Sequence, residues 1–288
     1  MERRILGRTG RELSIIGLGG VVFVGVDQNE SDTIVGEAID AGINYVDVAP
    51  SYGTDQETEK RIGPALLAGH RRDSIFLACK TGRRDRKGAE EELQQSLKNL
   101  ATDRFDLYQL HSITTRDDVE RIFGPDGAME AFVAAKEAGL ISHIGFSAHS
   151  VEAALMAMEL YDFDSALFPI NFVNVYNGDF GPQIIARAQE KGVARLALKA
   201  MARTSWRQDA PHSHPNCWYE PLTDPHFAAL ALRYTLSQPI TAAIPPGDPA
   251  LFKLAVKIAG AFTPITEAEV GELKNYAAGL NPIFSNVA

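Results

Sequence analysis

The sequence has little of what several classes of protein require. Only two cysteines, Cys79 and Cys217, occur in 288 residues, too few for a disulfide scaffold or a zinc site made of cysteines alone. No apolar run approaches the ~18 residues that cross a bilayer, and no signal-peptide core follows the charged first residues. The formal net charge of −9 gives no positive field for nucleic acid or anionic lipid. These absences predict a soluble, cytoplasmic protein without nucleic-acid or membrane partners.

What the sequence does have is a regular alternation of two patterns. Short apolar runs typical of buried strands occur at residues 14–18, 44–48, 75–79, 107–110, 143–146, 166–170, 194–198 and 241–244. Stretches with the helical period of 3.6 occur at residues 31–41, 57–68, 88–100, 128–138, 151–160, 183–191, 225–236 and 249–259. Eight strand-helix units predict an α/β protein, a (β/α)8 TIM barrel, as one domain over residues 1–288.

Three further segments add to this barrel. Residues 4–13 read as two short strands around a glycine-containing turn, which predicts an N-terminal β-hairpin that plugs one end. Residues 266–278 form an amphipathic pattern, which predicts an extra C-terminal helix. The aromatic-rich segment 202–224 has the length of a lid over substrate. Its His212, His214 and Cys217 lack an acidic partner at ligand spacing, so no metal site is expected. Ser31 and Ser150 are expected to cap helices.

Reactive side chains gather where predicted strands end, which is where a barrel of this kind carries its chemistry. Asp47 and Tyr52 follow the second strand, Lys80 ends the third and His111 ends the fourth. Singly, each has an ordinary explanation: a turn cap, a packed ring, a solvated cation or a satisfied core histidine. Their placement at successive strand ends favours a shared catalytic site.

The motif GINYVDVAPSYG at residues 42–53, followed by Lys80-Thr81 and DLYQLH at 106–111, resembles the aldo-keto reductase family. Residues 6–10 and 17–20 are similar to the opening of that family, and the resemblance spans essentially the whole chain. It implies an NAD(P)-dependent oxidoreductase that acts on a small-molecule carbonyl or alcohol. It also implies an Asp-Tyr-Lys-His catalytic tetrad and a cofactor contact at Gly20.

The chemistry of these four side chains agrees with that reaction. Reduction of a carbonyl needs hydride at carbon and a proton at oxygen, and a phenol with a pKa of roughly 10 keeps its proton at neutral pH. Tyr52 is therefore the expected proton donor. Lys80 would lower its pKa by favouring phenolate, while Asp47 holds the buried ammonium. His111 would orient the substrate oxygen, and in the oxidising direction the phenolate would act as base.

The cofactor is expected to lie across the loops after the strands, because no G-x-G-x-x-G follows a predicted strand. The resemblance implies that a Ser-Asn pair after the fifth strand holds the nicotinamide carboxamide. Here Ser147 is retained, alanine replaces the asparagine, and His149 is the candidate to compensate. The glutamine that the family has on the sixth strand is missing, and Asn171 is the nearest amide.

Two further loops depart from the family or resemble it in part. After the seventh strand, Leu198 replaces the usual aromatic, and Lys199, Ala200 and Met201 follow where a neutral Ser-Pro pair is usual. Lys199 is expected to contact pyrophosphate, although a solvated lysine is the alternative. After the eighth strand, Gly247 and Lys253 resemble the adenosine-phosphate loop, with Asp248 opposing a 2′-phosphate. Since the family mostly uses NADP, NADP is the expected cofactor and NAD remains possible.

Other functions are compatible with the same residues. One is an NAD-dependent sugar-type dehydrogenase that runs in the oxidising direction. Another is a nucleotide-binding regulatory subunit with weak turnover, because the nicotinamide contacts are altered. A third is a lyase or aldolase that uses Lys80 or Lys199 as a Schiff base, since one fold hosts many chemistries.

Overall fold

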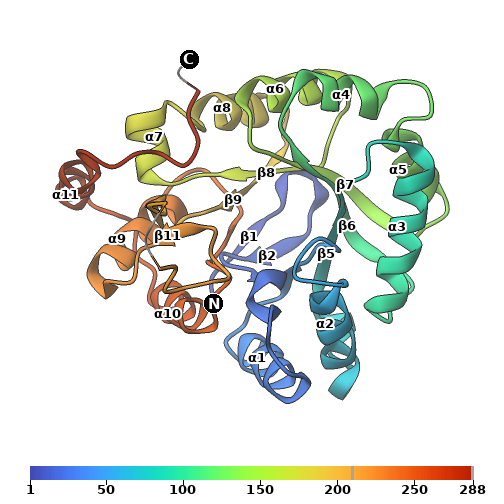
Figure 1. The fold of residues 1–288 in the computed structure, drawn as a ribbon, viewed down its shortest axis with the longest axis horizontal. Coiled ribbons are helices and arrows are strands. Elements are labelled where there is room, and N and C mark those ends of the chain that lie inside the picture. The colour runs from blue at the N-terminus through green and yellow to red at the C-terminus, as the bar shows by residue number, and fades with distance from the viewer. Residues whose placement is uncertain (209–210, 287–288) are drawn as a thin grey trace.

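Eight parallel strands form a barrel in the computed structural model, which describes residues 1–208 and 211–286 (Figure 1). Each strand pairs with its neighbour in chain order: β3 (Leu18–Gly19), β4 (Tyr45–Asp47), β5 (Phe76–Thr81), β6 (Phe105–Ile113), β7 (Ile141–Ala148), β8 (Ser165–Pro169), β9 (Ala194–Leu198) and β12 (Ala242–Ile244). Ile16, just before β3, forms a parallel bridge with Ala243 of β12. The first and last strands therefore meet, and the predicted (β/α)8 barrel is confirmed.

The helices lie around the outside of the strands (Figure 1). All eight predicted helices are present: α1 (Gln28–Asp40), α2 (Glu57–Leu67), α3 (Arg86–Asn99), α5 (Ala128–Glu137), α6 (Val151–Leu160), α8 (Pro182–Glu190), α9 (Pro225–Leu236) and α10 (Pro249–Gly260). The predicted C-terminal helix is α11 (Glu267–Ala277). Two helices were not predicted, α4 (Arg116–Phe123) and α7 (Phe172–Gly178).

The N-terminal hairpin closes one end of the barrel, as predicted. Strand β1 (Arg3–Ile5) pairs antiparallel with β2 (Glu12–Ser14) around a 3-10 turn. Leu6 and Leu13 are fully buried and belong to the same hydrophobic cluster as Tyr45 and Phe76, which stand near the starts of β4 and β5. Because the hairpin fills the end where strands begin, the opposite end is left for loops and side chains.

The two predicted caps had different outcomes. Ser150 caps α6, since its Oγ accepts from the Ala153 backbone N–H at 3.2 Å. The prediction for Ser31 was wrong, because α1 begins three residues earlier and is capped by Asp27. Because the first turn of α1 is polar, the apolar pattern that indicated this helix begins one turn after the helix does.

The segment 202–224 contains an antiparallel hairpin and lies over the end of the barrel where strands finish. Its strands β10 (Ala202–Ser205) and β11 (Tyr219–Pro221) pair antiparallel, while residues 209 and 210 lie outside the described residues. Between the strands, the Asn216 Nδ2 donates to the Val24 carbonyl at 3.1 Å, and His214 pairs with Asp248 at 2.9 Å. The segment thus connects β9 with the loops that follow β3 and β12, the place expected of a lid.

None of the helices in the described ranges combines the length and apolar character that a membrane span requires.

Candidate active site

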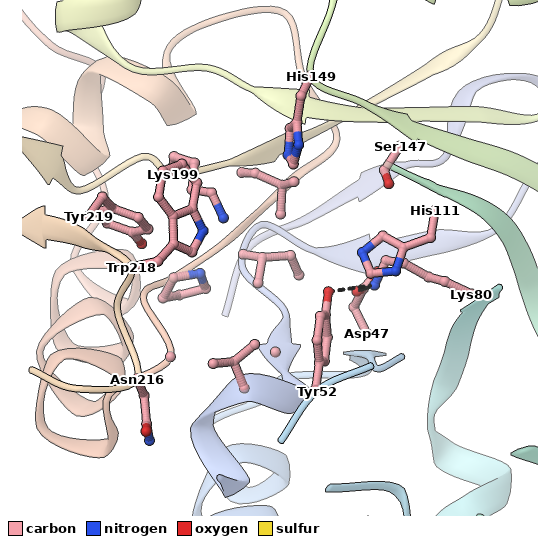
Figure 2. Close-up of a pocket in the computed structure, with 16 residues that line it drawn as sticks. Asp47, Tyr52, Lys80, His111, Ser147, His149, Lys199, Asn216, Trp218 and Tyr219 are labelled. Atoms are coloured by element: carbon pink, nitrogen blue, oxygen red, sulfur yellow. Dashed lines mark hydrogen bonds and ion pairs between the residues drawn. The ribbon is translucent and has the colours of Figure 1, made fainter. Parts of the chain in front are cut away.

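The four predicted catalytic side chains line one cavity at the end of the barrel where strands finish (Figure 2). Asp47 is the last residue of β4, and Lys80 and His111 lie near the ends of β5 and β6. Tyr52 lies in the loop between β4 and α2. Parallel strands end at a common edge, so residues more than sixty positions apart come together here.

The cavity has a lining that the sequence predicted only in part. Its residues are Gly19, Val21, Asp47, Tyr52, Lys80, His111, Ser147, His149, Leu198, Lys199, Asn216, Trp218, Tyr219, Ile244, Pro245 and Gly247.

Lys80 is the centre of the polar cluster. Its Nζ forms an ion pair with the Asp47 carboxylate and donates to the Tyr52 Oη at 3.1 Å and to the Val48 carbonyl at 3.3 Å. The side chains of Asp47 and Lys80 are both almost completely buried. A buried ion pair is stable only when its remaining polar atoms are bonded, and here three acceptors surround one ammonium.

Two residues that the sequence analysis missed complete the environment of Asp47. Its Oδ2 accepts from the Tyr45 hydroxyl at 2.8 Å and from the Gln109 Nε2 at 3.1 Å. A signal was available, because residues two apart on a strand face the same side. Tyr45 precedes Asp47 by two positions and Gln109 precedes His111 by two, so both point into the barrel interior with the predicted residues.

Burial and charge together fix the protonation of Lys80 and Tyr52. Burial lowers the pKa of Lys80, but the neighbouring Asp47 charge and Tyr52 outweigh it, so the pKa of Lys80 is raised above its ordinary value. Burial also raises the pKa of Tyr52, by more than the Lys80 ammonium lowers it. The expected influence of Lys80 is present, yet it is the smaller effect. At neutral pH the pair is an ammonium beside a protonated phenol.

The loop that carries Tyr52 is held close to the barrel. The Tyr52 backbone N–H donates to the Ala49 carbonyl at 3.1 Å, and the Thr58 hydroxyl donates to the Tyr52 carbonyl at 3.4 Å. A Cβ on Gly20 would lie 2.9 Å from the Val48 Cγ2 and 3.1 Å from the Tyr52 ring. Gly20 therefore makes room for the phenol, and it does not itself line the cavity.

His111 lies beside the phenol as a neutral imidazole. Its ring meets the Tyr52 ring edge-on with centroids 5.7 Å apart, and its Nδ1 lies 3.4 Å from the Ser51 Oγ. Burial, followed by the nearby Lys80 charge, lowers the pKa of His111 well below its usual range. A neutral ring has one N–H donor and one acceptor nitrogen, which suits it to bond a substrate oxygen.

Ser147 and His149 also line the cavity, and both bond to the residue that follows His111. The Ser147 Oγ accepts from the Ser112 backbone N–H at 2.7 Å, and the His149 Nδ1 lies 3.0 Å from the Ser112 Oγ. The His149 ring stacks on Phe284 at 4.6 Å between centroids. Burial, followed by the Lys199 charge, lowers the pKa of His149 to about 4, so this ring too is neutral at pH 7.

Lys199 brings a second cation to the cavity (Figure 2). Its Nζ lies over the rings of Trp218 and Tyr219, 5.1 and 5.3 Å from their centroids. No carboxylate of the described residues pairs with it, and burial lowers its pKa to about 8. The ring faces stabilise an ammonium here. The sequence indicated an aromatic-rich lid, but it did not indicate which rings would meet this lysine.

The remaining predicted cofactor residues are distributed unevenly. Gly247 lines the cavity, close against Val21. Ala200 and Met201 are fully buried and do not line it. Asn171 is buried as the cap of α7, where its Oδ1 accepts from the Asn174 N–H at 2.9 Å. Lys253 is 61% exposed and pairs with Glu37 at 3.0 Å, away from the lining residues.

Within residues 1–208 and 211–286, no three His, Cys, Asp or Glu side chains come close enough together to hold a metal ion.

Comparison with known proteins identifies the class. The model of the aldo/keto reductase family matches residues 15–217, which include the whole tetrad. The chain belongs to the aldo/keto reductase family. Its barrel is similar to the holo form of aldo-keto reductase AKR11C1 from Bacillus halodurans, with 25% identity, a TM-score of 0.75 and coverage of 98% of this chain and 99% of the other.

Two curated relatives come from Bacillus subtilis. The uncharacterized oxidoreductase YqkF is 36% identical over 51% of this chain and 49% of its own length. The aldo-keto reductase YhdN is 29% identical over 70% of this chain and 63% of its own length. The chain thus spans about half the length of YqkF and less than two thirds of the length of YhdN.

Proposed function

We propose that the protein is an NAD(P)-dependent oxidoreductase that transfers hydride between a nicotinamide and a small carbonyl or alcohol. The observation that carries this proposal is the 3.1 Å contact between the Lys80 Nζ and the Tyr52 Oη, two residues that line the cavity described above. A protonated phenol beside a fixed ammonium is suited to give its proton, because the ammonium stabilises the phenolate that remains.

Each member of the tetrad has a distinct task in this reaction. A bound reduced nicotinamide supplies hydride for the carbonyl carbon. Tyr52 gives its phenolic proton to the carbonyl oxygen and regains one from solvent. Asp47 keeps Lys80 charged and in place, and His111 bonds the substrate oxygen so that it faces the phenol. In the reverse direction, the Tyr52 phenolate accepts the proton of an alcohol.

The residues of the cavity fit the nicotinamide and pyrophosphate parts of such a cofactor. Lys199 is a cation without a carboxylate partner among the described residues, and a phosphate would provide the missing anion. The Ser147 hydroxyl accepts one hydrogen bond and still has its own hydrogen to donate. Gly247, in the loop after β12, and Asn216, between β10 and β11, also line the cavity, so the lining includes the loop where the adenosine end is expected.

The adenosine end fits a 2′-phosphate less well. Lys253 is engaged with Glu37, and Asp248 caps α10 by accepting from the Ala250 and Leu251 backbone N–H groups. A carboxylate at that helix end repels a phosphate. We therefore propose that the chain binds NADH and NADPH with similar affinity, in place of the preference for NADP that the family resemblance implies.

Steady-state turnover tests the proposed function. A generic aldehyde is offered with NADH and with NADPH, an alcohol with the oxidised forms, and cofactor binding is followed by protein fluorescence. Turnover with either cofactor supports the proposal. Binding without turnover for any aldehyde or alcohol would instead indicate a regulatory nucleotide-binding subunit.

A second candidate, Schiff-base chemistry at Lys199, has one observation in its favour. Burial lowers the pKa of this lysine to about 8, so part of it is an unprotonated nucleophile at neutral pH. Lys80 lacks this property because Asp47 holds it charged. Borohydride reduction with an aldehyde, in the absence of nicotinamide, would leave a stable adduct on Lys199 if this candidate were correct, and mass spectrometry of the peptide detects it.

We also propose the cytoplasmic location that the composition predicts. Cys79 and Cys217 are both buried and unpaired thiols, as is usual where the surroundings are reducing.

A further inference from the structure

The residue after His111 has an unusual backbone conformation. Ser112 has φ of +55°, in the left-handed region that favours glycine. For residues with a side chain this conformation is strained and persists only where the surroundings impose it. Ser112 lies inside β6, where the register with β7 shifts between Leu110 and Ile113. We call this bend of the strand the turn at Ser112. It directly follows a side chain that points into the cavity, so its geometry influences where the imidazole of His111 lies.

Arg84 holds this turn from the side of the barrel wall. It lies in the loop between β5 and α3, and its guanidinium donates to the His111 carbonyl at 2.8 Å and to the Ser112 carbonyl at 3.0 Å. The third contact of the guanidinium is with the Asp118 carboxylate at 2.8 Å. One planar group thus bonds two successive carbonyls and a carboxylate in a fixed geometry, which the flexible side chain of a lysine does not reproduce.

Arg84 is itself fixed at both ends. Its backbone carbonyl accepts from the Ala128 N–H at 3.0 Å, and the next residue, Asp85, caps α3. Asp118 belongs to the capping box of α4, where its carboxylate also accepts from the Thr115 N–H. The guanidinium is therefore held between the starts of two helices, and its position relative to β6 is rigid.

The other polar groups of the turn are also engaged. The Ser112 N–H donates to Ser147 and its hydroxyl bonds His149, both of which line the cavity. Arg84 bonds the carbonyls of the turn, while Ser147 and His149 bond the N–H and the hydroxyl of Ser112. Without the arginine, the two carbonyls lose their hydrogen-bond donor. The strained conformation is then held only by the bonds of Ser112 to Ser147 and His149.

We propose that Arg84, together with Asp118, is a positioning residue for catalysis, which holds the left-handed turn at Ser112 so that the His111 imidazole meets the substrate oxygen. The proposal rests on the proposed function of His111 in orienting that oxygen. Arg84 does not line the cavity, so it would act through His111.

Steady-state kinetics of three variants form the first arm of the test. Arg84→Ala should lower kcat by about 100-fold, the effect of displacing a reacting geometry by about 1 Å, while cofactor affinity stays within about threefold. Arg84→Lys should also be impaired, because a flexible lysine lacks the planar fork that bonds both carbonyls and Asp118 at once in a fixed geometry. Arg86→Ala is the matched control, since Arg86 is exposed and bonds Glu90 and Glu130 in the same region. It should keep wild-type kcat.

The histidine ring itself provides a second arm that does not need turnover. Nitrogen-detected NMR reports which ring nitrogen of His111 carries the proton, and a His111→Asn variant assigns the signal. We expect a single tautomer in the wild type and averaging between the two tautomers in Arg84→Ala. A folded Arg84→Ala protein that kept both kcat and the wild-type His111 tautomer would overturn the proposal.

A third arm, with two double variants, separates backbone strain from simple loss of charge. Glycine adopts positive φ without cost, so Ser112→Gly introduced into Arg84→Ala should restore part of the lost kcat. Ser112→Ala in the same background keeps the strain and should restore none. Equal activity of the two double variants would refute the role of Arg84 in holding the turn. If the wild type turned over no substrate, the proposed function would fail, and the NMR arm would still decide whether Arg84 positions the ring.

Discussion

Tyr52 differs from the other hydroxyl groups of the cavity in touching a buried ammonium. Tyr52→Phe removes that hydroxyl and leaves the ring that packs against His111. Loss of a general acid typically lowers turnover by about 10²–10⁴-fold, so we expect a fall of that size. Cofactor affinity should stay within about threefold, because no phosphate contact changes. Turnover and cofactor fluorescence are measured on the same preparation, and undiminished turnover would remove Tyr52 from the mechanism.

Lys199 is the second cation of the cavity, and its role can be isolated. A charge-assisted contact to phosphate contributes about 1.5–3 kcal/mol, roughly ten- to a hundredfold in affinity. Lys199→Ala should weaken NADH and NADPH by similar factors. Lys253→Ala is the control, because Lys253 pairs with Glu37 on the surface, and both affinities should stay unchanged. A selective loss of NADPH in the control would show that Lys253 reaches the 2′-phosphate after all.

At the scale of single residues, the sequence predicted which side chains lie together where a general rule of the fold places them. Strand ends of a barrel share one face, so Asp47, Lys80 and His111 were brought together correctly. A role transferred to the nearest side chain of the right kind has no such rule behind it and stays a prediction. Asn171 is an amide close to the missing glutamine in sequence, but it caps α7 and lies outside the lining. Its side chain is held by a local cap, because its Oδ1 bonds the backbone N–H of Asn174, three residues further along the chain.

The unpredicted elements have two different explanations. Helix α4 begins with a capping box between Thr115 and Asp118, and this signal is visible in the sequence, although only eight residues follow it. Helix α7 has seven residues, among them two valines, two asparagines and a glycine, which are poor helix formers. Its existence depends on packing against α11 and on the cap from Asn171. Tertiary contacts of this kind leave no local pattern.

Helix α11 is attached to α9 by an ion pair that should depend on pH. Glu269 in the first turn of α11 pairs with Arg233 of α9 at 2.6 Å and accepts from the Thr266 N–H at 2.8 Å. These contacts, Arg233 first, lower the pKa of Glu269 to about 2. A depressed carboxyl pKa adds stability that is fully present above the unfolded value, about 4.3, and is lost as pH falls through the folded value.

We therefore expect Glu269→Gln to lower the melting temperature at pH 7 and to have a smaller effect at pH 2.5. Glutamine keeps the capping geometry, so the variant tests the charge alone. Glu267→Gln removes the same charge from the same turn without touching a partner of Arg233. It should change the melting temperature little at either pH. An equal loss at pH 7 and pH 2.5 for Glu269→Gln would contradict the assigned ion pair.

In the whole molecule, the two ends of the barrel have separate tasks. The N-terminal hairpin packs Leu6 and Leu13 into the end where strands begin, while the tetrad lies at the end where strands finish. Between them lie interior side chains such as Leu107 and Leu196, which are buried and apolar. We expect such a core to separate stability from catalysis, because the structure around a deleted side chain relaxes only partially and near the cavity it leaves.

Leu6→Ala tests this separation. Leu6 is fully buried, and replacing a buried leucine by alanine costs about 2–5 kcal/mol, depending on how far the site collapses. The free energy of unfolding in urea should fall by that amount, whereas kcat measured well below the transition should stay within about twofold. Ile5→Ala is the matched control, since Ile5 is the adjacent residue and is 58% exposed. It should change stability by less than about 0.5 kcal/mol. A large fall of kcat in folded Leu6→Ala would show that the hairpin is coupled to the tetrad through the interior of the barrel, and that the two ends do not act independently.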